Sequence, residues 1–318
     1  MIYLRAFTSA LVLAMLAGPA TAFGDQIFVL NKQSNSMSIV DSGTFEVTST
    51  VSVGEQPHEM AILPGGDKAY VSNVGENSIS VVDLKEGAET GKITTPDFSF
   101  PHGIAFTPDS RIAIVTSERT QKIVVIDART DEILRSIDTA EAGTHMVVID
   151  DTGRWAYFTN RESNTVSVMD LNDYRIVASI PVGEGAEGIA LSPDGKQIWT
   201  GDRRGDTVTV IDTETRRVIQ KLPAGGAPIR VAFSPDGSRV FVPNSISSDV
   251  FVYAADSREH IKTIEVGGGP GGVVFSADGR YAYVACGGAG SVYAIDTATL
   301  EVSGQVSVGE GPDGITYQ

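Results

Sequence analysis

The chain of 318 residues contains a single cysteine, Cys286. One cysteine cannot form an internal disulfide, so the fold has to be held by burial and backbone pairing. No cationic residue adjoins Cys286 in the sequence to favour a thiolate, and we therefore expect a small buried residue there. Histidine is also scarce, with four in the chain, so the place of each one carries information.

Basic residues are few relative to acidic ones. The chain has 24 Lys and Arg against 40 Asp and Glu, which gives a net charge of −16. Removal of residues 1–22 would take Arg5 and no acid, leaving −17. An acidic body of this size argues against nucleic acid or an anionic membrane as a partner.

Long apolar runs are missing as well. The run at residues 6–16 is too short to span a bilayer, and no later stretch reaches the necessary length, so membrane insertion is not expected. This run follows Arg5 and precedes Gly-Pro and then Ala-Thr-Ala at residues 20–22, the pattern of a cleaved secretory signal. We predict a signal peptide at residues 1–22 and a periplasmic or secreted protein.

The local motifs of common enzyme classes are absent. The sequence has no H-E-x-x-H, C-x-x-C, G-x-S-x-G or P-loop. G-x-G-x-x-G occurs at residues 183–188, but it precedes a predicted strand instead of opening a helix. We expect no nucleotide cofactor, and any activity would depend on residues gathered from distant segments.

What the chain does have is repetition. An aspartate that ends an apolar run recurs every 42 to 44 residues, with Ala254 filling one of seven places. This period is typical of four-stranded propeller blades. We predict an all-β, seven-bladed β-propeller with four antiparallel strands per blade as a single domain over residues 23–318. The repeated aspartates are Asp41, Asp83, Asp127, Asp170, Asp212 and Asp296.

The two ends of the chain should complete one blade together. Residues 26–30, 37–40 and 47–53 match strands two, three and four of a blade without a first strand. Residues 314–317 match the first strand of the other units. Pairing of these segments would remove the exposed edges of an open ring.

Three second strands carry a family pattern. They read Ala-Tyr-Val-Ser-Asn at residues 69–73, Ala-Tyr-Phe-Thr-Asn at 156–160 and Val-Phe-Val-Pro-Asn at 240–244. In these segments the chain resembles the YVTN-repeat β-propellers, a family of extracytoplasmic proteins that includes YncE-like and lactonase-like members. The resemblance implies the propeller fold for the whole mature chain, but members differ in function. We include the terminal residues Asn73, Asn160 and Asn244 among the candidate ligand-binding residues.

The repeat register places three of the four histidines at one position. His58, His102 and His145 each start the first strand of consecutive blades, next to the central channel at the face we call the top. Three imidazoles that meet there would suit a Zn, Cu or Fe ion with one open position. The alternative is that they are polar residues at a channel mouth, bonded to backbone or water.

Carboxylates continue this ring. Glu187 and Asp313 occupy the same register position in two other blades, and Glu59 and Glu118 lie close to it. We treat Glu59, Glu118 and Glu187 as candidate general acids or bases and Asp313 as a candidate ligand.

Positive charge is concentrated on the top loops of the middle blades. Arg161, Arg203 and Arg230 could clamp a carboxylate or phosphate group there. The alternative is solvated loop arginines paired with nearby acids such as Glu162.

Two functions from different classes stay open at this point. The first is a binding propeller that takes a small molecule or protein at its top-face funnel, with or without a three-histidine metal site. The second is a metal-dependent enzyme, such as a hydrolase or lactonase, a lyase or an oxidase, acting on a small anionic substrate in the same funnel.

Overall fold

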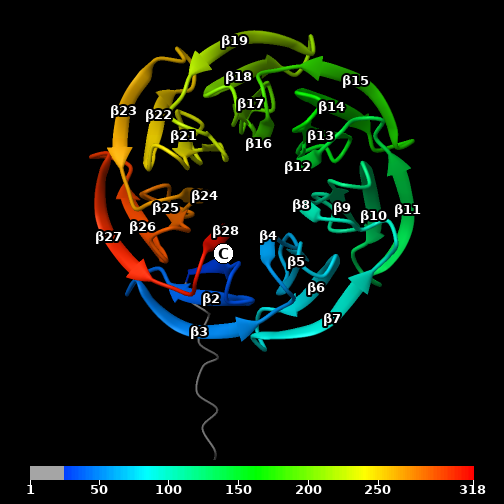
Figure 1. Ribbon diagram of the computed structural model, residues 1–318, viewed down its shortest axis with the longest axis horizontal. Helices are drawn as coiled ribbons and strands as arrows, with labels where there is room; N and C mark the ends of the chain where they lie inside the picture. Colours follow the sequence, from blue (N-terminus) through cyan, green and yellow to red (C-terminus); the bar gives the residue numbers. More distant parts are fainter. Residues whose placement is uncertain (1–24) are drawn as a thin grey trace, which may run out of the picture.

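The computed structural model describes residues 25–318, so the expected signal peptide at 1–22 lies outside the described part. The described chain consists of 28 strands in seven four-stranded antiparallel sheets, which are arranged as a ring around a common axis (Figure 1). The predicted all-β, seven-bladed propeller is confirmed. Residues 25–318 include no helix with the length and apolarity to cross a membrane.

Each blade has its first strand innermost and its fourth strand on the rim. Blade 1 comprises β4 (Pro57–Ile62), β5 (Lys68–Asn73), β6 (Ser78–Asp83) and β7 (Ala88–Thr94). Blade 2 comprises β8 (Pro101–Phe106), β9 (Ile112–Ser117), β10 (Lys122–Asp127) and β11 (Glu132–Asp138). Blade 3 comprises β12 (Thr144–Ile149), β13 (Trp155–Asn160), β14 (Thr165–Asp170) and β15 (Arg175–Pro181). Blades 4 and 5 comprise β16 (Ala186–Leu191), β17 (Gln197–Asp202), β18 (Thr207–Asp212) and β19 (Arg217–Pro223); and β20 (Ala232–Phe233), β21 (Arg239–Asn244), β22 (Asp249–Ala254) and β23 (His260–Glu265). Blade 6 comprises β24 (Pro270–Phe275), β25 (Tyr281–Cys286), β26 (Ser291–Asp296) and β27 (Glu301–Ser307), and blade 7 comprises β28 (Pro312–Tyr317), β1 (Gln26–Asn31), β2 (Ser36–Asp41) and β3 (Glu46–Ser52).

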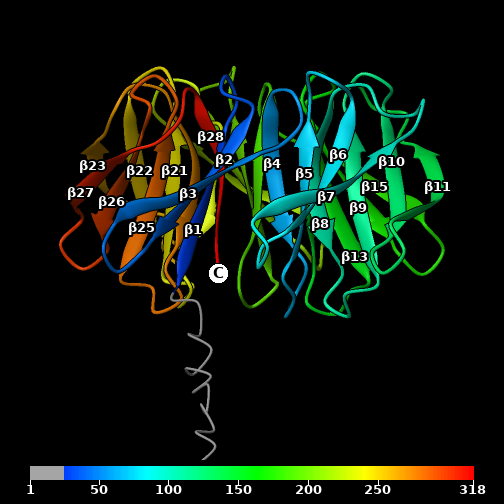
Figure 2. The ribbon, with the colours of Figure 1, turned by 90° about the horizontal axis from the view of Figure 1, so that it is seen from below.

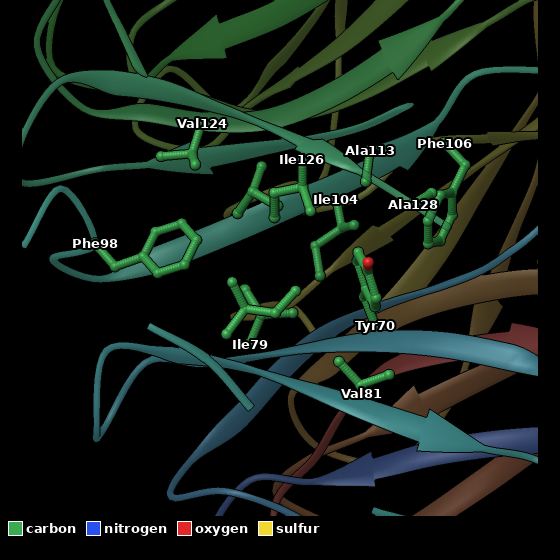
Figure 3. Packing of buried hydrophobic residues seen from close by; sticks show 12 residues of the cluster. Tyr70, Ile79, Val81, Phe98, Ile104, Phe106, Ala113, Val124, Ile126 and Ala128 are labelled. Atoms are coloured by element: carbon green, nitrogen blue, oxygen red, sulfur yellow. The ribbon is translucent and has the colours of Figure 1, made fainter. Parts of the chain in front are cut away.

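The middle strands are buried on both faces because each sheet packs between two neighbours. All four central residues of β10 are buried, whereas β11 on the rim is mostly exposed or half-buried. Between blades 1 and 2, Tyr70, Ile79 and Phe106 contribute to one such layer (Figure 3). Apolar side chains that point both ways from a strand therefore build the ring instead of a two-layer sandwich.

Blade 7 closes the ring with both ends of the chain. β28 pairs antiparallel with β1, and the register sets Ile27 opposite Tyr317 and Val29 opposite Ile315. The predicted closure is confirmed. In the view along the sheets, the C-terminus lies at the face opposite the one where β28 begins (Figure 2).

The first strands share an irregularity at their starts. In β4 the ladder shifts between Pro57 and Glu59, and β8, β12, β16 and β24 shift at the equivalent place. A bulge takes a residue out of the ladder and re-aims its side chain. In blade 5 the effect is larger, because β20 covers two residues and Pro228 joins Asn244 through an isolated bridge. The first strand of blade 5 therefore begins at Ala232, three residues after Ile229, which holds the place of the histidines in the repeat register.

Candidate functional site

The three histidines come from adjacent innermost strands and meet at the top of the channel. The bulges leave His58, His102 and His145 outside the regular ladder. The ring centroids of His58 and His102 lie 4.2 Å apart, and those of His102 and His145 lie 3.6 Å apart. We call these histidines and the charged residues around them the hub. The charged residues are Glu59, Glu118, Glu187, Asp313, Arg161, Arg203 and Arg230.

Several imidazole nitrogens in the hub have no hydrogen-bond partner. Both ring nitrogens of His102 are buried and unpaired, as are Nδ1 of His58 and Nε2 of His145. Burial, with the nearby charges, holds the pKa values of His102 and His145 well below the usual range, so both rings are neutral near pH 7. A buried polar atom without a partner is costly, and a neutral imidazole nitrogen is a metal ligand.

The donor atoms divide the hub into two parts. His58, Glu59 and His102 can each offer one ligand atom, and these three atoms lie within 4.8 Å of one another. His145 instead bonds through Nδ1 to Glu118 Oε2 at 2.7 Å, while its Nε2 lies 3.9 Å from Glu187 Oε1. A metal site formed by all three histidines therefore stays a prediction, and the compact set of donor atoms comes from two histidines and one carboxylate.

Glu59 joins the hub to the far side of the channel. Its carboxylate accepts a hydrogen bond from the Arg230 guanidinium, which comes from blade 5. Burial alone would raise the pKa of Glu59, but the charge of Arg230 and the contact with His58 outweigh it, so the pKa lies below its ordinary value. Glu59 is ionised and almost completely buried with its partner.

Asp313 extends the carboxylate set on the side of blade 7. One of its oxygens lies 3.4 Å from His58 Nε2 and 3.7 Å from Lys32 Nζ. Burial raises the pKa of Asp313, and His58, Arg230 and Lys32 together lower it by more. An ionised oxygen is thus available beside the compact donor set.

The other two predicted arginines converge on Glu187. Arg203 Nη1 donates to both carboxylate oxygens at 3.0 and 3.2 Å, and Arg161 Nε lies 3.6 Å from the same group. Arg161 also lies 3.5 Å from Glu118. Burial raises the pKa of Glu187, but His145, Arg203 and Arg161 lower it by more, so the pKa lies below its ordinary value. These guanidiniums face the hub and not the loop acid Glu162, which pairs with Arg204.

The sequence did not reveal the pair formed by Glu59 and Arg230, because 171 residues separate them. A signal was nevertheless present. Both residues follow the ring position directly, where four other blades have glycine and one has Met146. The opposite charges of Glu59 and Arg230 at this one position could have suggested an ion pair across the channel. The glycines are Gly103, Gly188, Gly272 and Gly314.

Comparisons with known proteins agree with this architecture. The YNCE-like beta-propeller family matches residues 5–133, and the Cytochrome D1 heme domain family matches residues 108–265. The uncharacterized protein YncE of Salmonella typhimurium is 25% identical over 161 residues, which cover 50% of this chain and 45% of that protein. This chain is a seven-bladed β-propeller whose first part is similar to the YNCE-like family. It spans less than half the length of the first curated relatives that it matches.

Solved structures share the same fold. Hydrazine synthase of Kuenenia stuttgartiensis superimposes with a TM-score of 0.79 at 26% identity, over 86% of this chain and 92% of that one. Dihydro-heme d1 dehydrogenase NirN, solved in complex with DHE, gives a TM-score of 0.69 at 16% identity, over 92% of this chain and 74% of that one. The second likeness concerns the fold alone.

The three predicted asparagines have their hydrogen-bond partners within their own blades. Asn73, Asn160 and Asn244 are completely buried at the ends of their second strands. Their amides donate to side chains of the adjacent third strand, for example from Asn73 to Ser78 and Ser80 at 3.0 and 2.8 Å. These bonds connect the second and third strands of each blade, and a role of the three asparagines in ligand binding stays a prediction. Burial raises the pKa of Cys286 to about 12, which fits the expected inert thiol.

A groove of about 750 Å³ lies on the opposite face, between blades 2 and 3. Its charged residues are satisfied locally, as Arg129 Nη2 lies 2.6 Å from Asp127. The groove contains no unpaired buried polar group among the atoms described. Among the described residues, unpaired buried polar atoms therefore mark the hub and not this groove.

Proposed function

We propose that the protein is an extracytoplasmic binding propeller whose hub holds a divalent transition-metal ion and, above it, a small anionic ligand. His58, Glu59 and His102 would supply the metal ligands. The observation that supports this most is the group of buried imidazole nitrogens without partners next to ionised carboxylates. The extracytoplasmic location rests on the signal pattern at residues 1–22.

The charge and tautomer of the hub suit such an ion. Two imidazoles and one carboxylate match the preferences of Zn²⁺, Cu²⁺ or Fe²⁺, and a water or Asp313 could complete the sphere. Glu118 accepts from His145 Nδ1, so the lone pair of His145 is on Nε2, where it faces the channel side of the hub. An anion above the ion would find Arg161 and Arg203 at the rim.

A tetrapyrrole is the second candidate ligand. The segment that matches the Cytochrome D1 heme domain family, residues 108–265, contains His145, Arg161 and Arg203. Histidine ligates haem iron and arginine pairs with carboxylate groups, so both kinds of contact are available. His102 is completely buried and His145 is 1% exposed, however, and a macrocycle would have to displace hub side chains. The same burial makes a single ion the better fit.

An enzymatic role is the weaker alternative. A metal-dependent hydrolase, lyase or oxidase would need Glu59, Glu118 or Glu187 to move a proton. Glu59 and Glu187 have lowered pKa values and arginine partners, which favours permanent ionisation over proton transfer near pH 7. We therefore prefer binding.

Elemental analysis after equilibration with Zn²⁺, Cu²⁺ or Fe²⁺ and dialysis tests the proposal. We expect about one ion per chain in the wild type and a loss of at least about tenfold in affinity for His58→Ala and His102→Ala. His260→Ala is the control, because His260 lies on the rim strand β23 and bonds to Thr263. A wild type that retains no ion, or equal retention in all variants, would exclude the metal. Absorption titration with haem then tests the tetrapyrrole.

A further inference from the structure

Arg230 spans the channel as a single side chain. It leaves blade 5, donates from Nη1 to the carbonyl of Ile229 at 2.8 Å, and reaches Glu59 of blade 1 with Nη2. Blades 6 and 7 stand between these two on one side of the ring, and Gly271, Gly272 and Gly314 give that side no bulk at the level of the crossing. Arg230 is 7% exposed and Glu59 is 9% exposed, so the pair is buried inside the ring.

Glu59 takes part in two arrangements that exclude each other. Its Oε1 accepts a hydrogen bond from Arg230 and also lies 3.6 Å from the unpaired Nδ1 of His58. A dication at the compact donor set would lie a few ångströms from the guanidinium, where repulsion is strong because both charges are away from water. The ion and Arg230 therefore compete for one carboxylate.

We propose that metal binding transfers Glu59 from Arg230 to the ion, and that the released Arg230 becomes the anion-binding group of the hub. The metal and a small oxyanion or carboxylate ligand then bind cooperatively, with the anion between the ion and the guanidinium. This inference rests on the proposed metal site. It distinguishes Arg230 from Arg161 and Arg203, which keep carboxylate partners in Glu118 and Glu187.

The first test measures Zn²⁺ affinity by calorimetry. Arg230→Met removes the competitor for Glu59, so we expect Zn²⁺ to bind about tenfold more tightly than in the wild type, within the usual range of coupling between sites. Lys32→Met is the matched control, since it removes one positive charge near the hub but contacts Asp313 and not Glu59. We expect less than about threefold change there. The gain should disappear in the double variant Glu59→Gln, Arg230→Met.

The second test needs no metal and uses inorganic sulfate as the probe. Glu59→Gln cannot hold Arg230 by charge, so its metal-free form should bind sulfate about tenfold more tightly than the metal-free wild type. The double variant should lose this binding. If Glu59→Gln fails to fold, the Zn²⁺ series decides alone.

The outcomes separate the two proposals. A wild type that binds no Zn²⁺ overturns both the metal site and the exchange. Zn²⁺ binding with equal affinity in wild type and Arg230→Met, or a gain matched by Lys32→Met, overturns the exchange and leaves the metal site in place. Sulfate binding by Glu59→Gln no tighter than by the wild type also overturns the exchange.

Discussion

Asp202 stands where four other blades have asparagine. It is completely buried and accepts hydrogen bonds from Thr200, Thr207 and Thr209 at 2.8, 2.9 and 2.6 Å. Burial raises the pKa of its carboxyl despite these bonds. Burial therefore disfavours the ionised carboxylate at a position where four other blades have a neutral amide. The four asparagines are Asn31, Asn73, Asn160 and Asn244.

Asp202→Asn should stabilise the protein at neutral pH. Because the folded-state pKa of Asp202 is raised, its stabilising contribution is complete below the unfolded pKa and is lost as the pH rises through the folded pKa. We expect the variant to gain about 1 kcal/mol at pH 7, the scale of one hydrogen bond, and to match the wild type near pH 4. Urea unfolding of both proteins across this range measures the difference. A difference that grows as the pH falls would contradict the assignment.

The identity of the hub residues was predictable, and their partners were not. A constant repeat spacing fixes which residues share a ring position, so His58, His102 and His145 could be placed together from the sequence. Side-chain direction depends on rotamers and on the bulges at the strand starts. The bond from His145 to Glu118 and the crossing by Arg230 therefore appear only in three dimensions.

Among the elements, β28 determines how blade 7 meets blade 1. A Cβ on Gly314 would collide with the backbone carbonyl of His58 and lie 3.1 Å from Leu30 Cδ1. This oxygen is a backbone atom and not the end of a flexible side chain, so it cannot withdraw easily. The close approach of β28 to β4 thus fixes the position of one proposed metal ligand.

Gly314→Ala should damage stability and metal binding together. We expect a loss of about 1 to 3 kcal/mol from overpacking and weaker Zn²⁺ retention because His58 is displaced. Gly268→Ala is the control, since no heavy atom lies within 4 Å of its added Cβ, and its effect should stay within about 0.5 kcal/mol. Thermal unfolding and metal content of both variants test this. Equal behaviour would show that the contact is not tight.

Deletion of residues 313–318 should destabilise the ring severely. The deletion removes an innermost strand and exposes the edge of β1, so we expect a loss on the order of 5 kcal/mol. Tyr317→Phe is the mild comparison, because it removes only the 2.6 Å bond to Asp25 Oδ2. An unchanged urea midpoint in the truncated protein would contradict closure by β28.

The sequence pattern predicted that each strand exists, but it did not predict the short length of β20 in blade 5. Turn residues and apolar runs mark every strand, and these local signals are the same in all units. β20 is short because Arg230 turns into the channel to meet a residue four blades away around one side of the ring. Tertiary contact of this kind overrides the repeat.

At the scale of the whole molecule, the shared blade joins the two ends. The backbone of Gln26 donates to Gln318 O at 2.7 Å and accepts from Gln318 N at 3.0 Å. A short linker could join these residues, and new ends could be opened elsewhere in the ring.

Two circular permutants should differ in stability. Opening between Asp278 and Gly279, in the turn after β24, leaves blade 6 shared between the new ends. Opening between Gly267 and Gly268, between blades, leaves no shared blade. We expect the first permutant to unfold within about 4 °C of the wild type and the second to lose about 2 kcal/mol or more, because its ring closes through side-chain packing alone. Equal midpoints would show that sharing a blade adds nothing.

The pairing of β28 with β1 also sets an order in time. These strands lie at opposite ends of the described chain, so their contact has nearly the greatest sequence separation the fold allows. Hairpins within blades can form early because their loops are short, whereas the closing contact must wait until the last strand has been made. Until then, β1 offers a free edge. We expect refolding to end in one slow step that depends on β28, and aggregation of the incomplete chain to compete with that step.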